Sequence, residues 1–385
     1  MWDLENVMRR IGMIVVLLSL SSAGVVAQDL ENIQIHGFAT QGILFSSQNN
    51  YLTMKSSSGS LRWTEGAVSV SDAVSDKLRV GIQLHMYQIG TFGGPNVVVD
   101  WASGDYKASE QFGMRFGKIK TPAGLFNDSQ DVDSLFLWIL LPQAMYPVDN
   151  RDYELAELGG ELYGRVPLDE RWGRLQYAVH AGSSTLDADG GYVEQLAQFG
   201  LTFSQTPSGS VYGGDLRWSL PKIGLSVGAS ALNDTLDGTG PEGSVHMPGA
   251  LTQAYSAQWD LGRLHVAAEY WRTPFYAVLN TPLGSMTEGF DERSWYPMAR
   301  YEFTKKLQIG SYYSHYLNKA GDTSQPQNYS RDWVVSGRYD FNSYFYGKVE
   351  GHFLHGTGLG YYTSSNPDGL KPSANMLAAR VGFTF

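Results

Sequence analysis

Apolar and polar residues alternate along most of the chain after residue 31, in segments of about ten residues separated by turns. In residues 77–87, KLRVGIQLHMY, nearly every second residue is apolar. The same alternation returns in residues 33–43, 223–231, 263–271, 295–303 and 377–385. Because successive side chains of a strand point to opposite faces, each segment is predicted to be a strand with one apolar and one polar face.

The connections between these segments alternate in length. Short turns are predicted at residues 75–77, 167–171, 221–222, 260–263, 304–306 and 342–344. Longer Gly-, Asp-, Asn- and Ser-rich loops are predicted at residues 46–60, 89–95, 121–152, 184–208, 234–249, 274–291, 318–328 and 357–373. This sorting is typical of an all-β, transmembrane, antiparallel up-and-down β-barrel of about 16 strands, with long extracellular loops and short periplasmic turns.

The apolar faces of the strands are predicted to face lipid. A barrel of about 16 strands is too wide for side chains to fill, so its interior is an aqueous channel lined by the polar faces. Tryptophan placement supports this orientation, because tryptophans gather at the interfacial girdles of membrane barrels. Trp101, Trp172, Trp218 and Trp259 lie beside predicted short turns, and Trp271, Trp295 and Trp333 lie beside predicted long loops.

The chain ends on an apolar strand face. Leu377, Val381, Phe383 and Phe385 share that face in the last segment. An unpaired terminal strand of this kind would invite aggregation. Pairing of residues 377–385 with residues 33–43 would close the barrel and remove both edges, and lipid would cover Phe385.

Composition narrows the functional classes. The 385-residue chain has no cysteine, which excludes disulfides and thiolate metal sites, and its net charge of −10 argues against a general nucleic-acid binder. Residues 1–27 have a polar start ending in Arg9 and Arg10, an apolar run and a small-residue stretch before Gln28, which is the layout of a cleavable secretory signal. We therefore expect a signal peptide at residues 1–27, secretion through the inner membrane, and an outer-membrane barrel at residues 28–385.

Charged residues on the polar strand faces are the candidates for setting channel selectivity. Strand parity assigns to the lumen the basic residues Arg79, Arg115, Arg174, Arg217, Arg300, Arg338 and Arg380 and the acidic residues Glu157, Glu161 and Glu269. Lys118 and Lys120 lead into the longest loop but share the side of Phe116, so a bulge or the strand end must reorient them. Arg115, Lys118 and Lys120 are expected to favour small anions. The alternative, wall charges that brace the barrel through carboxylates, stays open for each residue.

Three stretches carry a resemblance to a known family. The C-terminal ARVGFTF, residues 112–132 (FGMRFGKIKTPAGLFNDSQDV), and the segments LLPQAMY (140–146) and GGELYG (159–164) resemble the Gram-negative outer-membrane porin superfamily, in the branch that includes phosphate-selective porins. The resemblance implies a homotrimer with a loop folded into each pore, here residues 121–152 as the constriction. It also implies that the final strand, with Phe383 and Phe385, is the signal for the barrel-assembly machinery.

The candidate constriction loop departs from that branch. Phosphate-selective porins concentrate basic residues at the constriction, whereas residues 121–152 are acidic and apolar around FLWILL. This departure counts against phosphate selectivity and leaves a phosphate channel as one of the alternatives.

The sequence favours a channel in the outer-membrane bilayer for passive diffusion of small hydrophilic solutes or ions, with a weak preference for anions. No catalytic residue, metal ligand or cofactor is assigned, because His352 and His355 point to opposite faces of a strand and no Ser/His/Asp spacing exceeds chance. The alternatives are a substrate-specific channel for phosphate, organic anions or sugars, an outer-membrane barrel hydrolase, and an adhesin.

Overall fold

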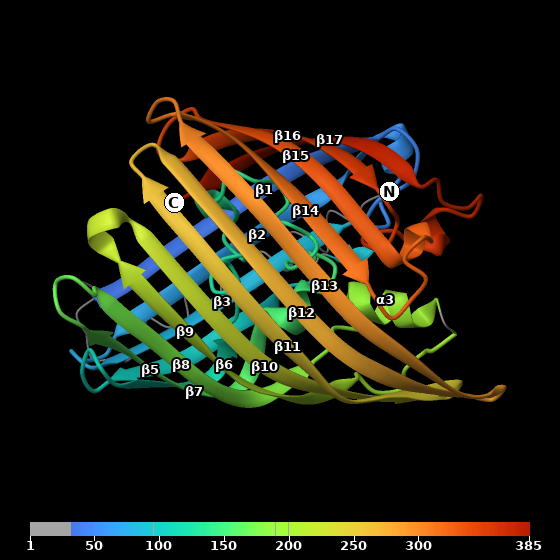
Figure 1. The fold of residues 1–385 in the computed structure, drawn as a ribbon, viewed down its shortest axis with the longest axis horizontal. Coiled ribbons are helices and arrows are strands. Elements are labelled where there is room, and N and C mark those ends of the chain that lie inside the picture. The colour runs from blue at the N-terminus through green and yellow to red at the C-terminus, as the bar shows by residue number, and fades with distance from the viewer. Residues whose placement is uncertain (1–31, 95, 189, 199) are drawn as a thin grey trace, which may run out of the picture.

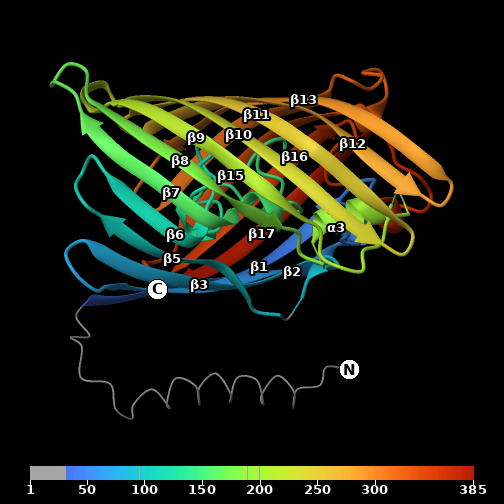
Figure 2. The same ribbon diagram turned by 90° about the horizontal axis from the view of Figure 1, so that it is seen from below.

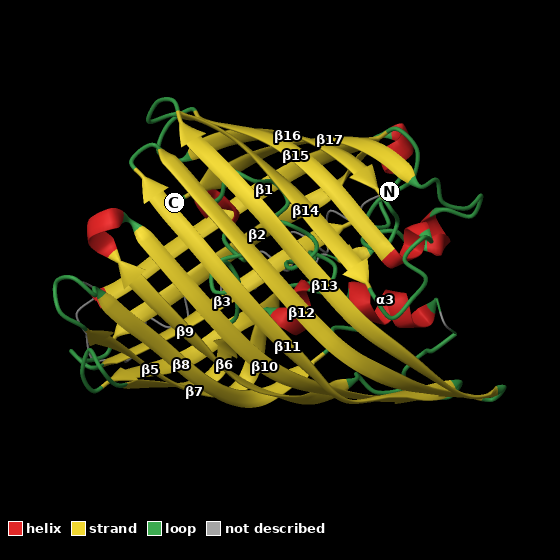
Figure 3. Ribbon diagram, in the orientation of Figure 1, coloured by secondary structure: helices red, strands yellow, loops and turns green. Residues whose placement is uncertain are grey.

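A closed antiparallel β-barrel is formed by the residues that the computed structural model describes, namely 32–94, 96–188, 190–198 and 200–385 (Figure 1). The wall has sixteen long strands, and a two-residue strand, β4, is added beside β3. Figure 3 shows how little helix accompanies the strands. The prediction of an all-β up-and-down barrel is confirmed. The predicted signal peptide, residues 1–27, lies outside the described residues.

The strands have the following bounds: β1 Ile33–Ser46, β2 Ser60–Ala73, β3 Leu78–Ile89, β4 Phe92–Gly93, β5 Val98–Lys107, β6 Gly113–Lys120, β7 Ala156–Pro167, β8 Arg174–Thr185, β9 Ser208–Leu220, β10 Leu225–Gly240, β11 Gly243–Leu261, β12 Leu264–Thr281, β13 Gly284–Glu302, β14 Leu307–Asn318, β15 Tyr329–Asp340, β16 Phe345–His355 and β17 Ser373–Thr384. Among the described residues, the helices longer than three residues are α2, Arg151–Glu154, and α3, Gly191–Ala197.

The barrel closes between its first and last strands. β1 pairs with β17 from Phe38 opposite Thr384 to Ser46 opposite Met376. The backbone N–H of Phe385 donates to the carbonyl of Gly37 at 3.0 Å, and the reverse bond is 3.1 Å long. The predicted pairing of the two ends is therefore confirmed, and it leaves neither strand with a free edge.

The apolar faces of the strands point away from the barrel interior. Leu158, Val179 and Val381 are each about 60% exposed, while their inward neighbours Glu157 and Arg380 are buried. Apolar side chains that the barrel leaves uncovered on its outer face are suited to hydrocarbon, as in membrane barrels.

The prediction of a long loop is wrong for two segments. Residues 234–249 and 274–291 instead continue the ladders of β10–β11 and β12–β13, which end in two-residue connections, 241–242 and 282–283. These four strands are 16 to 19 residues long and reach beyond their neighbours at the long-loop rim (Figure 1). Their polar, Gly-rich composition predicts loops, but the inward side chains of Leu236, Met247 and Leu279 pack with other residues. These partners are Leu186, Leu196 and Leu201 of the segment around α3, and this packing stabilises the strands.

Two of the seven predicted girdle tryptophans lie inside the barrel. Trp101 pairs with the inward, buried Gln83, and Trp271 lies with its ring centroid 5.7 Å from that of Tyr146. Trp172, Trp259, Trp295 and Trp333 are exposed on the outer face. Part of the set of tryptophans predicted from sequence position therefore contributes to the interfacial girdle.

No helix within the described residues has the length and apolar character to cross a membrane. No group of three or more metal-ligating side chains suited to an ion occurs among these residues either.

Candidate functional site

Residues 121–155, between β6 and β7, turn into the barrel interior (Figure 2), and we call them the inner loop. Leu137 to Leu141, at the centre of the inner loop, are all buried. Leu137, Trp138 and Leu141 lie in one apolar cluster with Tyr296, Tyr312 and Val334 from β13, β14 and β15. Ile139 and Leu140 lie in another with Leu44 and Ala378 from β1 and β17. The apolar run FLWILL therefore seats the inner loop on one side of the wall.

Two buried carboxylates hold the backbone of the inner loop. Glu350 on β16 accepts hydrogen bonds from the N–H groups of Ile139 and Leu140, both 2.9 Å long. Glu269 on β12 accepts one from the N–H of Leu125 at 2.7 Å and one from the hydroxyl of Tyr146 at 2.6 Å. Burial, and then the Glu269 charge, raise the pKa of the Tyr146 hydroxyl. Each carboxylate thus accepts two hydrogen bonds from the inner loop, and these contacts fix the loop to β12 and β16.

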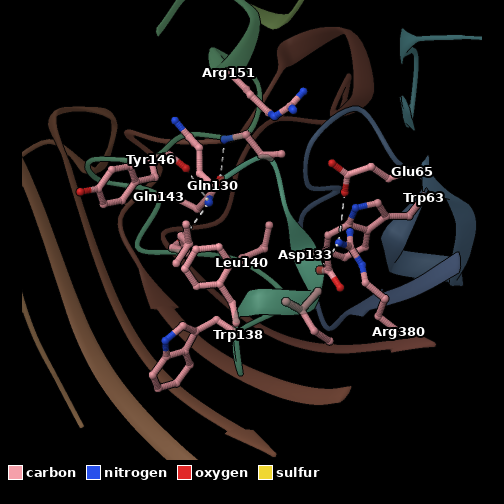
Figure 4. Close-up of a pocket in the computed structure, with 14 residues that line it drawn as sticks. Trp63, Glu65, Gln130, Asp133, Trp138, Leu140, Gln143, Tyr146, Arg151 and Arg380 are labelled. Atoms are coloured by element: carbon pink, nitrogen blue, oxygen red, sulfur yellow. Dashed lines mark hydrogen bonds and ion pairs between the residues drawn. The ribbon is translucent and has the colours of Figure 1, made fainter. Parts of the chain in front are cut away.

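Asp133 of the inner loop is the centre of a buried ion cluster (Figure 4). Its carboxylate lies 2.8 Å from Nη1 of Arg380 and 2.9 Å from Nζ of Lys348. Arg380 also contacts Glu65 at 3.3 Å. Burial alone would raise the pKa of Asp133, but the Lys348 and Arg380 cations lower it to about 2. Asp133 is therefore ionised across the ordinary pH range.

Backbone carbonyls of the inner loop are also paired with basic side chains of the wall. Arg338 on β15 donates to the carbonyls of Ser134 and Phe136, the latter at 2.9 Å. Lys348 on β16 donates to the carbonyl of Trp138 at 3.0 Å. The cations on this side of the barrel are thus committed to the inner loop.

Both ends of the inner loop are tied to other strands. At its start, Nη2 of Arg217 on β9 donates to the carbonyl of Gly124 at 2.6 Å, and the N–H of Gly124 donates to the Ser230 hydroxyl at 3.1 Å. At its end, Arg151 in α2 lies 2.9 Å from the carboxylate of Asp100 on β5. Its pKa is raised because the Asp100 and Glu65 carboxylates outweigh its burial.

A second set of loops packs above the inner loop at the long-loop rim. The hydroxyl of Tyr362, between β16 and β17, donates to the carboxylate of Asp149. Gln195 of α3 donates to the Tyr362 oxygen at 3.3 Å. Burial raises the pKa of Asp149. Three connections that are distant in the sequence therefore meet at this carboxylate.

The opposite side of the interior, along β5 to β9, is more open. A cavity of about 360 Å³ lies there between the inner loop and the wall. Arg115 contacts Glu161 at 2.8 Å and Asp105 at 3.0 Å in its lining. Arg217 contacts Asp215 at 2.9 Å and lies 3.8 Å from Asp128 of the inner loop. Four basic and five acidic side chains line the cavity: Lys107, Arg115, Arg165 and Arg217, with Asp105, Glu110, Asp128, Glu161 and Asp215.

The structure divides the predicted lumen residues into groups. Arg115, Arg217 and Glu161 line the cavity. Arg79, Arg174 and Arg300 lie on the inner faces of β3, β8 and β13, near the short turns, where Arg79 donates to Gln34 and Arg300 to Gln308, each at 3.0 Å. By contrast, four predicted residues are covered within the wall and loop: Glu157, Glu269, Arg338 and Arg380. Because they contact protein groups in place of open water, they are better explained as bracing groups than as lining of a channel.

The two lysines before the inner loop differ from each other. Lys118 pairs across the ladder with Ala102 and Leu158, and Leu158 is exposed on the outer face. Its Nζ donates to the backbone carbonyl of Val99. The expectation that a bulge turns Lys118 into the lumen is therefore wrong, because the pairing of β5, β6 and β7 stays regular there. Lys120, at the strand end, does turn inward and lies 2.7 Å from Asp131.

Sequence reasoning missed Asp105 of β5, which contacts Arg115 and lines the cavity. It also missed Ser230 and Tyr296, which contact Gly124 and Glu269. Alternation around Asp105 could have placed it on an inner face, but its pairing with Arg115 depends on the register between β5 and β6.

No protein-family model matches the chain, and no curated protein matches it. Solved structures do match its fold. The anion-selective porin from Comamonas acidovorans aligns with a TM-score of 0.59 and 11% identity, over 92% of this chain and 99% of its own. OmpF of Salmonella typhi, solved with daunomycin, aligns with a TM-score of 0.59 and 15% identity, over 92% and 97%.

A trimer form of the outer membrane protein OmpT of Vibrio cholerae also aligns, with a TM-score of 0.55 and 12% identity, over 92% of this chain and 99% of its own. At these identities the similarity shows a shared outer-membrane barrel fold. It does not show that the chain belongs to the phosphate-selective branch.

Proposed function

We propose that this protein is an outer-membrane porin whose water-filled channel allows passive diffusion of small hydrophilic solutes or ions. The observation that carries the proposal is the asymmetric seating of the inner loop. Buried contacts fix the loop to the wall of β12 to β17 and β1, while a charged cavity remains between the loop and β5 to β9. A rigid loop that narrows a polar barrel on one side leaves a defined passage, which is how a pore sorts solutes by size.

The inner loop is the constriction in this proposal, and Arg115 and Arg217 are the cations beside its passage. Each is matched by carboxylates, and the cavity lining holds four basic and five acidic groups. We therefore propose weak ion selectivity, with the anion attraction of Arg115 and Arg217 nearly balanced by Asp105, Asp128 and Glu161.

Delivery and assembly follow from the same proposal. Residues 1–27 would act as a cleavable signal that directs the chain through the inner membrane. Phe383 and Phe385, on the outward face of the last strand, would be recognised by the barrel-assembly machinery. The OmpT trimer form supports a homotrimeric assembly as the arrangement to test.

Planar-bilayer recording tests the channel directly. Residues 28–385, refolded in detergent and added to a bilayer, should produce uniform conductance steps and a small reversal potential under a salt gradient. Protein unfolded by heating is the control and should produce no steps. Refolded barrels that insert without conducting would contradict the proposal.

A substrate-specific channel is the second transport candidate, favoured by the two arginines in a cavity of only about 360 Å³. Uptake of phosphate, an organic anion or a sugar that saturates and blocks ion current would support it. Ion current unaffected by each solute would favour simple diffusion.

A barrel hydrolase is a further candidate because His355 lies 2.8 Å from the hydroxyl of Ser373. His355 is exposed, whereas the three buried histidines in the described part of the chain are each paired with a carboxylate: His85 with Glu65, His180 with Glu157 and His352 with Asp332. Ester hydrolysis in detergent that disappears in Ser373→Ala would support an enzyme. An adhesin, in contrast, would retain its function when the pore is plugged.

A further inference from the structure

A row of aromatic side chains crosses the outer face of five neighbouring strands, β12 to β16. Its members are Tyr270, Trp295, Tyr313, Trp333 and Phe353. Tyr270 is opposite Trp295, Tyr313 is opposite Trp333, and Trp333 is opposite Phe353 in the ladders. Between β13 and β14 the row shifts by two residues, because Trp295 is opposite His315. Outward aromatic side chains at one level mark the boundary between hydrocarbon and headgroups.

On each of these strands, an arginine or a histidine lies two residues from the aromatic residue, on the side nearer the long-loop rim. These are Arg272, Arg293, His315, Arg331 and His355, which we call the basic row. Two strand residues span roughly 6–7 Å and keep the same face. The ladders place Arg272 opposite Arg293, His315 opposite Arg331, and Arg331 opposite His355. Between β13 and β14 the same two-residue shift places Arg293 opposite Leu317. On each strand the basic row therefore lies on the long-loop side of the aromatic row, which is the headgroup side of such a boundary.

The basic row retains positive charge. Arg272 and Arg293 share one carboxylate, that of Asp291, each at 2.8 Å. Arg331 lies over the ring of Tyr329, 5.0 Å from its centroid, and makes no ion pair with any described carboxylate. His315 stacks on Trp295 at 5.5 Å. Three guanidinium groups thus face outward against one acidic group.

We propose that the basic row binds the phosphate groups of anionic lipids in the leaflet at the long-loop rim. Charge complementarity and depth both favour this occupant, because phosphates lie just outside the hydrocarbon boundary. The three permanent cations are all arginines, whose planar fork matches two phosphate oxygens. Docking of this face on the same face of a second copy would instead bring guanidinium groups together.

The test compares two triple variants of residues 28–385 in detergent. Arg272→Gln, Arg293→Gln and Arg331→Gln remove the three permanent charges of the basic row. Lys222→Gln, Lys305→Gln and Lys306→Gln remove three exposed charges at the short-turn rim and are the matched control. Phosphatidic acid and phosphatidylcholine with identical acyl chains are the probes. Native mass spectrometry counts the bound lipids and the subunits.

The wild-type protein and the control variant should retain phosphatidic acid in preference to phosphatidylcholine, and the arginine variant should lose about tenfold or more of that preference. Equal losses in both variants, or no preference in the wild type, would overturn the proposal. A changed subunit count with intact lipid preference would also overturn it and identify a subunit interface. If the triple variant fails to fold, the single variants Arg272→Gln and Arg331→Gln should each lose part of the preference.

Discussion

The guanidinium of Arg380 lies 2.8 Å from the carboxylate of Asp133, so an ion pair joins the last strand of the barrel to the inner loop. Both side chains are nearly inaccessible to water. A buried ion pair is costly to form, and removal of one partner leaves the other charge buried without its counter-charge. The position of the inner loop therefore depends on the pair remaining complete.

Replacement of Asp133 by Asn is expected to loosen the inner loop. The change leaves Arg380 and Lys348 close together without their shared carboxylate, at a cost of about 3–5 kcal/mol. Bilayer recordings should show more current fluctuation, and thermal unfolding should begin at a lower temperature. Asp322→Asn is the matched control, because Asp322 is exposed in the loop between β14 and β15. Quiet channels from Asp133→Asn would contradict this role.

The Asp133 ion cluster is expected to survive mild acid. Its pKa of about 2 lies below the ordinary value of 3.8, because Lys348 and Arg380 stabilise the carboxylate. The stabilisation, about 2 kcal/mol, is complete above the unfolded-state pKa and is lost as the pH falls through about 2. The difference in unfolding temperature between wild type and Asp133→Asn should stay constant from pH 7 to 5 and shrink between pH 4 and 2. A difference already shrinking above pH 5 would argue against the ion cluster.

Neutralisation of Arg115 is expected to shift ion selectivity toward cations. Arg115→Gln removes a positive charge from the cavity lining and leaves the Asp105 and Glu161 carboxylates in place. Reversal potentials under a salt gradient should move by an amount that corresponds to roughly a twofold or larger change in permeability ratio. Lys118→Gln is the matched control, since it removes the same charge from the same strand on the outer face. Equal shifts in the two variants would contradict the assigned register.

Replacement of Gly124 in the inner loop by Ala is expected to lower stability and to displace the loop. Its φ is +58°, and an added Cβ would lie 2.5 Å from the Trp271 ring and 2.7 Å from Oε1 of Glu269. Gly200 has a similar φ of +78° with open space around it. Both Ala variants carry the backbone strain of about 1–2 kcal/mol, but only Gly124→Ala should also displace the inner loop. Thermal unfolding and single-channel conductance should change more in Gly124→Ala than in Gly200→Ala. Matching behaviour would show that the contacts around Gly124 are loose.

The features that could be predicted from the sequence depend on residues that are close together in the chain. Alternation in β3 and β17 assigned inner and outer faces correctly, because the direction of a strand side chain depends only on its parity within the strand. The same parity placed Arg115, Arg217 and Arg300 on the inner wall. The pairing of β1 with β17 also followed, because an apolar terminal strand needs a partner.

The tertiary structure alone decided which inward charges face open space and which hold the inner loop. Arg115 and Arg380 have the same parity assignment, yet one lines a cavity and the other is buried against Asp133, 247 positions away in the chain. It also decided that Lys118 faces outward and that residues 234–249 extend a hairpin. These outcomes depend on register and packing between distant segments, and the free energy of such contacts is not encoded in any local pattern of residues.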